Sequence, residues 1–321
     1  MKRKILIFIA VIIFIAVAYT GFYIYKMLKM DWIEYQMIKK EAEDANNIAV
    51  AASSGNWDKV ERMIYYSADV NVHNRDGATA LMFACAYEKK EIIELLIEEG
   101  ADVNAQDDDE DTALGSSIRT GNIEIIKLLI KNGADVNLPN NFGLTPLFLA
   151  SKFDKNEIVE LLIKNGADIN VQDITGVSAL KSACINKRYK MVRFLIENGA
   201  DVDLRSHHGN APIISSLIHN HLEIAKLLYT YIDVSKYTNT EKLMICSYVG
   251  DFDKVKELVL DEKTDPNASV NGYTALMGAV NAENMEIIDF LIEEGADPNV
   301  KNDTFGMSAN DYAEKKGIDL N

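Results

Sequence analysis

The chain begins with a long run of apolar positions. Residues 1–4 form a basic cluster, and the 21 residues that follow, 5–25, carry no charge. As a helix rising about 1.5 Å per residue they would extend about 31 Å, which matches a hydrocarbon core about 30 Å thick. Three tyrosines gather near the end of the run, where amphipathic rings favour the membrane interface. The pattern predicts a transmembrane helix over residues 5–25.

A cleaved signal peptide is the alternative for this run. Residues 5–15 would form its apolar core, and residues 16–18 (Ala-Val-Ala) offer a small-residue cleavage site after Ala18. Because the apolar run continues to Tyr25, an uncleaved signal anchor is favoured. The compact basic cluster ahead of the run places the N-terminus in the cytoplasm and the rest of the chain outside it.

Residues 26–44 are amphipathic. Leu28, Trp32 and Tyr35 fall on one face at helical spacing, with charged residues elsewhere. The spacing predicts a juxtamembrane helix. A stalk that packs on the region that follows is favoured over a second element on the membrane surface.

From about residue 42 the chain repeats one unit. Its aspartate recurs every 33 residues from Asp69 to Asp201, and every 32 residues from there to Asp297. Ahead of the aspartate runs a stretch with helical apolar spacing, such as residues 124–130, and before that a shorter helix with small residues at its centre, such as 79–86. Each predicted helix pair has an apolar face that only its neighbours can cover.

A period of 33 residues that carries a Thr-Ala-Leu or Thr-Pro-Leu helix, a second helix and a Gly-Ala-Asp turn resembles the ankyrin repeat. The resemblance implies an all-α fold: an α-solenoid of about eight ankyrin repeats plus a C-terminal capping helix, with β-turn fingers projecting to one side. The implied repeat domain spans residues 45–321, with repeats at about 43–72, 76–105, 109–138, 142–171, 175–204, 208–237, 238–268 and 271–300 and the cap at 304–321.

Two places depart from the repeat. Glu110 replaces the finger glycine within the acidic run 107–111. Residues 230–242 lose the Gly-Ala-Asp turn and shorten the finger, so the sixth and seventh repeats are expected to join imperfectly.

Charge narrows the choice of partners. Residues 1–30 hold five of the 33 basic residues and no acid, so residues 31–321 carry 28 − 49 = −21. Such an acidic body is repelled by phosphate backbones, and nucleic-acid binding is therefore not expected.

The sequence offers no recognisable catalytic chemistry. Nucleotide-binding, zinc-protease and hydrolase motifs are missing. Four histidines lie close in sequence, but the repeat register places His207 and His208 about 12 Å from His219 and His221, too far to share a metal. The three cysteines are too few for a disulfide framework. We expect no enzyme activity, no catalytic residue, no cofactor and no metal.

The sequence also predicts a surface that contacts another protein. The ankyrin resemblance implies that the residue after the first-helix leucine takes the family's variable position on the concave side. The fingertips add Phe142, Ile174, His207 and His208. Large apolar residues at exposed positions suggest a contact surface. For Phe148 and Met244, burial against neighbouring repeats is an equal alternative. The candidate protein-binding surface is Met82, Asp108, Asp109, Phe142, Phe148, Lys181, Ile214, Met244 and Met277.

These observations predict a scaffold that binds another protein through the concave face and fingertips and is tethered to a membrane through residues 5–25. The alternatives are a structural envelope protein that acts as a spacer without a client, and a protein secreted after signal cleavage.

Overall fold

A computed structural model of the chain describes residues 47–320. The predicted transmembrane helix, residues 5–25, and the predicted juxtamembrane helix, residues 26–44, lie outside the described residues. Within residues 47–320, no helix is both long enough and apolar enough to cross a membrane.

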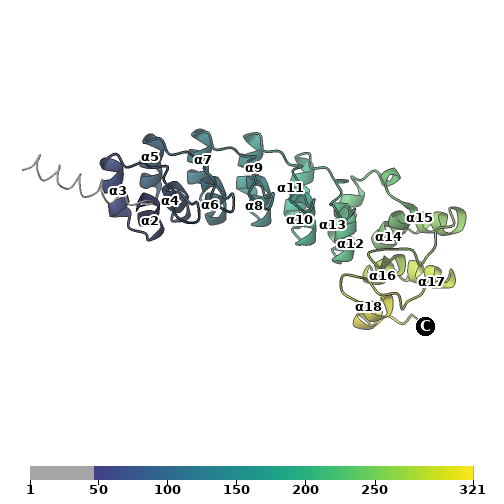
Figure 1. The fold of residues 1–321 in the computed structure, drawn as a ribbon. Helices are drawn as coiled ribbons and strands as arrows, with labels where there is room; N and C mark the ends of the chain where they lie inside the picture. Colours follow the sequence, from purple (N-terminus) through teal and green to yellow (C-terminus); the bar gives the residue numbers. More distant parts are fainter. Residues whose placement is uncertain (1–46, 321) are drawn as a thin grey trace, which may run out of the picture. The chain divides into compact units, whose positions relative to one another are not determined.

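Residues 47–320 form eight helix pairs and a final single helix (Figure 1). The chain divides into two compact units, and the division falls between Asp135 and Val136. The pairs of the first unit are α2 (Asn47–Ser53) with α3 (Trp57–Tyr65), α4 (Ala80–Ala86) with α5 (Lys90–Glu98), and α6 (Ala113–Thr120) with α7 (Ile123–Lys131).

The second unit holds the other five pairs and the last helix. These are α8 (Pro146–Lys152) with α9 (Asn156–Lys164), α10 (Ala179–Ile185) with α11 (Tyr189–Glu197), α12 (Pro212–Ile218) with α13 (Leu222–Tyr229), α14 (Asn239–Val249) with α15 (Phe252–Lys256) and its continuation η2 (Glu257–Asp261), α16 (Ala275–Asn281) with α17 (Met285–Glu293), and α18 (Ala309–Lys316). A short antiparallel pair, β1 (Ser269–Val270) and β2 (Tyr273–Thr274), precedes α16. The repeated helix pairs fit the predicted α-solenoid.

The helices are short, and their ends are set by local sequence. Thr112, for example, caps α6 by accepting a hydrogen bond from the Gly115 amide at 3.1 Å. Because helices of seven to nine residues are marginal alone in water, their stability comes from packing. In α7, Ile125, Ile126 and Leu129 are buried on one face, as the apolar spacing predicts.

Asparagine side chains join successive turns. The Asn104 Oδ1 accepts the Asp135 amide at 2.7 Å, and its Nδ2 donates to the Gly133 carbonyl at 2.9 Å. The equivalent residues Asn71, Asn137 and Asn267 make the same two contacts with the next turn. These four turns are therefore tied to their neighbours independently of the apolar core.

The finger turns pack closely against one another. Gly143 has a φ of 75°, and a Cβ there would lie 2.9 Å from the Ile174 backbone nitrogen in the next finger. Glu110, which replaces the glycine in its finger, keeps a left-handed φ of 58°. The Asp107 carboxylate holds that turn by accepting the Asp109 and Asp111 amides at 3.0 and 2.8 Å.

Residues 230–242 differ from the regular repeat, as the sequence predicts. A 3-10 turn, η1 (Val234–Lys236), replaces the finger, and α14 is extended to 11 residues. The expectation of an imperfect join needs correction, because Tyr237 is 3% exposed and anchors a set of polar contacts across the junction.

Candidate protein-binding surface

Two neighbouring fingertips of the second unit present apolar side chains to solvent. Phe142 is 53% exposed and Ile174 is 61% exposed. Their fingers are in direct contact, since the Ile174 amide donates to the Phe142 carbonyl at 3.1 Å. The two exposed side chains therefore lie on adjacent, directly bonded fingers, and we call them the fingertip pair.

The loops beneath the fingertip pair are ordered by their own side chains. The Asn140 Oδ1 accepts the Phe142 and Leu144 amides at 3.1 and 3.0 Å. In the next finger, the Asp173 Oδ1 accepts the Thr175 and Val177 amides at 2.8 and 2.9 Å. Because these bonds fix the turns, a partner that binds here orders little additional backbone.

The third finger extends the surface with two histidines. The His207 amide donates to the Thr175 carbonyl at 3.1 Å, and His207 and His208 are both exposed. His219 and His221 lie elsewhere: the His219 Nδ1 is 2.8 Å from the Ser215 carbonyl, and the His221 Nε2 is 3.0 Å from the Ile185 carbonyl. Residues 47–320 contain no group of histidine, cysteine and acidic side chains placed to hold a metal.

Six of the predicted binding residues occupy the position after the first-helix leucine, and we call them the concave row. Their exposure differs from what the sequence predicts. The six side chains are at most 5% exposed, so the expected exposure is wrong. For Phe148 and Met244, the structure favours the core alternative. The buried residues are Met82, Phe148, Lys181, Ile214, Met244 and Met277.

Packing between the first helices explains the burial. Five of the six residues are the third residue of a first helix, and Met244 lies in the longer α14. Within each unit these helices pack side by side: α4 on α6, α8 on α10, α10 on α12, and α14 on α12 and α16. A side chain at this position is covered by neighbouring repeats before any partner arrives.

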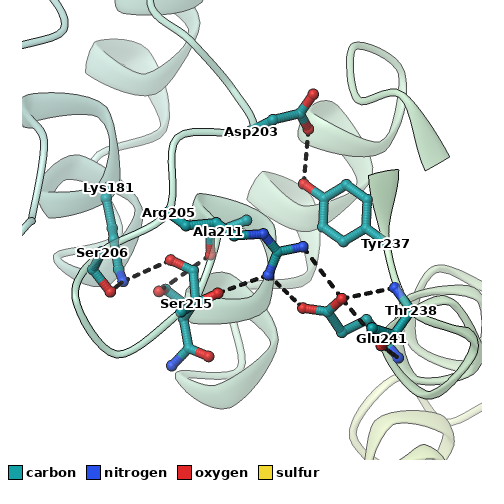
Figure 2. A network of polar contacts seen from close by, with 11 residues as sticks. Lys181, Asp203, Arg205, Ser206, Ala211, Ser215, Tyr237, Thr238 and Glu241 are labelled. Atoms are coloured by element: carbon teal, nitrogen blue, oxygen red, sulfur yellow. Dashed lines mark hydrogen bonds and ion pairs between the residues drawn. The ribbon is translucent and has the colours of Figure 1, made fainter. Parts of the chain in front are cut away.

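Lys181 shows how a polar residue is accommodated there. Its Nζ donates to the Ser206 Oγ and, at 2.9 Å, to the Asn210 carbonyl, both in the following finger (Figure 2). Burial lowers the pKa of the ammonium group to about 8. Lys181 therefore fastens a finger from inside the protein and presents no charge to a partner.

The acidic run forms a fingertip of the first unit. Asp108 and Asp109 are exposed, as the sequence analysis expects, and the Asp108 amide donates to the Asp76 carbonyl at 3.0 Å. Asp111 pairs with Arg119. The first unit thus carries negative charge on its fingers, while the second unit carries the apolar fingertip pair.

Comparison with known proteins identifies the repeat. The family model described as ankyrin repeats (3 copies) matches residues 47–140, 86–173, 147–239 and 243–319. A search among curated proteins returned no match. The matched segments together cover most of the sequence, so the chain belongs to the ankyrin repeat family.

Proposed function

We propose that this chain is a non-catalytic scaffold that binds another protein through its fingertips and is tethered to a membrane by residues 5–25. Ankyrin repeats generally mediate protein–protein interactions. The observation that carries the proposal is the fingertip pair, Phe142 and Ile174, exposed on ordered and directly bonded fingers.

Energetics favour a few large side chains as anchors. Interfaces draw most of their binding energy from a small number of residues, each worth about 2 kcal/mol or more on truncation. Phe142 supplies a large apolar area with few rotatable bonds, and Ile174 adds a branched side chain beside it. Asp108 and Asp109 on the first unit favour a partner that carries basic residues.

The fingertip pair yields a first test. The double substitution Phe142→Ala with Ile174→Ala should weaken partner binding by roughly 30-fold for each residue. Because both side chains are exposed, the free energy of unfolding should change by no more than about 0.5 kcal/mol for each. Co-purification of the partner with the full chain in mild detergent, together with a thermal melt, measures both quantities.

A matched control uses exposed aromatic residues at the other end of the first helices. Phe153 caps the end of α8 and Tyr189 begins α11, and they are 40% and 41% exposed. Their double alanine variant should retain the partner. Equal loss of the partner in both variants would refute a fingertip site. The spacer alternative predicts that no stoichiometric partner co-purifies even with the unmodified chain.

The membrane tether has its own test. Reporters that are active on only one side of the membrane, fused after Asn321, should report an extracytoplasmic repeat domain, because the basic cluster at residues 1–4 favours the cytoplasm. Activity of the cytoplasmic reporter alone would contradict this orientation. A mature N-terminus at Tyr19 would replace the anchor with a cleaved signal peptide.

A further inference from the structure

Two neighbouring loops of the second unit form a basic surface. Residues 152–155 run from the end of α8 to the start of α9, and residues 187–190 lead from α10 into α11. Together these eight residues hold five bases and one acid, a local net charge of 5 − 1 = +4, although residues 31–321 as a whole carry −21. We call this surface the basic edge, and its basic residues are Lys152, Lys155, Lys187, Arg188 and Lys190.

The two loops of the basic edge lie against each other. The Arg188 Nη1 is 3.4 Å from the Asp154 Oδ2, and α8 packs on α10. Within residues 47–320, Arg188 is the one member of the basic edge that has an ion-pair partner. The four lysines are exposed or half-buried. Their charge is therefore not neutralised by the described part of the chain.

The fifth helix pair reverses the charge of one repeat position. Among the eight second helices of residues 47–320, seven have an acid as their second residue, such as Glu157 in α9 and Glu223 in α13. In α11 this residue is Lys190, Arg188 is the N-cap, and the first turn holds no acid. Cations are unfavourable at the positive end of a helix dipole. The stability of α11 therefore does not explain Lys190, whereas an anionic ligand at the basic edge does.

A groove adjoins the basic edge. It has a volume of about 550 Å³ and lies between the starts of α11 and α13, with the apolar surfaces of Tyr189 and Leu222 among its walls. Tyr189 is 41% exposed. The His221 ring is held in the wall, because its Nε2 lies 3.0 Å from the Ile185 carbonyl. Glu223 lines the groove from α13, so the positive charge is confined to the α11 side.

We propose that the basic edge and this groove form a second binding site, which takes an acidic peptide segment of another protein with an apolar residue at one end of the acidic run. The acidic side chains pair with Lys187, Arg188 and Lys190, and the apolar residue enters the groove beside Tyr189. Burial of the apolar residue supplies affinity, and the charge pairs set orientation and association rate. The site follows the first helices and the fingers precede them, so it does not depend on the fingertip pair.

Other anionic occupants fit the surface less well. A nucleic acid or an anionic membrane surface extends over many charges and would meet the acidic body as well as the basic edge. The acidic fingertip of a second copy, residues 107–111, has the required charge but no apolar residue for the groove. Exposed ion pairs alone contribute little to association.

Fluorescence polarisation of a labelled peptide tests the site on the full chain in mild detergent. The probe is acetylated Leu-Gly-Asp-Glu-Asp-Glu with a fluorescent label at its acidic end. We expect saturable binding with a Kd below about 100 μM. Affinity should fall about 10-fold from 0.1 M to 1 M NaCl, as the screening length drops from about 10 to about 3 Å. Replacing the leucine of the peptide with serine should also weaken binding about 10-fold, because the groove loses its apolar occupant.

A double substitution in the basic edge removes the positive charge without disturbing the fold. Lys187→Glu with Lys190→Glu should weaken peptide binding by about 30-fold or more. Glu88 and Glu283 occupy the loop position of Lys187 with φ values of 56° and 57°, and Glu157 occupies the helix position of Lys190. Both substitutions therefore introduce a residue that the repeat already accepts, and the thermal midpoint should not fall.

The matched control is Lys164→Glu with Lys226→Glu. It makes the same change in net charge within the second unit, at exposed positions near the ends of α9 and α13 and away from the basic edge. This variant should bind the peptide as the unmodified chain does. Equal loss of binding in both variants would assign the effect to overall charge and overturn the proposed site.

Four further outcomes would overturn the proposal. These are no saturable binding by the unmodified chain, and equal affinity in the Lys187→Glu with Lys190→Glu variant. Displacement of the probe by glycerophosphoserine as effective as by unlabelled peptide would indicate a lipid surface instead. Self-association of the unmodified chain that this variant loses would indicate a second copy. The Phe142→Ala with Ile174→Ala variant should bind the peptide normally, so failure here is distinct from failure of the fingertip proposal.

Discussion

Phe148→Ala is expected to lower the free energy of unfolding by about 3–5 kcal/mol, the usual cost of truncating a buried phenylalanine. Phe148 is 5% exposed in α8, so its removal leaves a cavity between neighbouring first helices. Phe142→Ala, six residues earlier and on the fingertip, should change stability by no more than about 0.5 kcal/mol.

Denaturant unfolding of the two variants measures this contrast, and hydrogen exchange in α8 shows where the loss occurs. The exchange data matter because a repeat array can open in segments rather than all at once. Similar stability for the two variants would contradict the assignment of Phe148 to the core. A Phe148→Ala variant that is fully stable but loses its partner would restore the concave row as a binding surface.

Raising the pH from 8 to 10 is expected to destabilise the fold. Burial raises the pKa of the Cys85 and Cys184 thiols to about 12 and that of Cys246 to about 11, from an ordinary value of 9.0. In the unfolded chain these thiols ionise near pH 9, so the unfolded state binds fewer protons and stability falls with rising pH. Each thiol should remove about 1.4 kcal/mol between pH 8 and pH 10.

Other buried groups also change the stability of the fold between pH 8 and pH 10. Burial also raises the pKa values of Tyr237, Tyr248 and Tyr273, which adds to the fall near pH 10. Lys181 acts in the opposite direction. Its folded pKa of about 8 lies below the ordinary 10.5, so the penalty for its buried charge disappears as pH rises through this range. The three thiols outweigh one lysine, and the net change remains a loss.

Denaturant midpoints at pH 8 and pH 10 check the prediction. The double variant Cys85→Ala with Cys184→Ala should lose about 2.7 kcal/mol less than the unmodified chain over this interval, because two of the three titrating thiols are gone. Equal pH dependence in the two proteins would show that the thiols do not control it.

The sequence predicts the repeats well because their signals are local. The aspartate period, the helical apolar spacing and the turn glycines each depend on residues within one unit. The resulting helix pairs appear where these signals place them across residues 47–320. The exposed fingertip residues Phe142, Asp108 and Asp109 follow from the same register.

The burial of the concave row could not be read in this way, because it depends on how closely neighbouring first helices pack. Lys181 illustrates the limit: a lysine in a variable position suggests exposure, yet Ser206 and Asn210, from the next repeat, supply acceptors that allow burial. Ile174 was visible as a fingertip residue, but only the bonded fingers pair it with Phe142.

The contacts between the sixth and seventh helix pairs, within residues 203–241, can be predicted only in part from the sequence. The loss of the Gly-Ala-Asp turn is plain in the sequence. The partner of Glu241 is Arg205, 36 residues earlier, and no local pattern connects them. The sequence therefore predicts an imperfect join between the sixth and seventh repeats, whereas in the structure the Arg205–Glu241 ion pair links them.

Site-specific photo-crosslinking in cells tests the scaffold proposal most directly. A photoreactive amino acid is placed separately at Phe142 and Ile174, and, for comparison, at Phe153 and Tyr189. The account predicts that the two fingertip positions capture the same protein and that the two comparison positions do not. Capture of nothing at Phe142 and Ile174, or of the same protein with equal yield at all four positions, would contradict it.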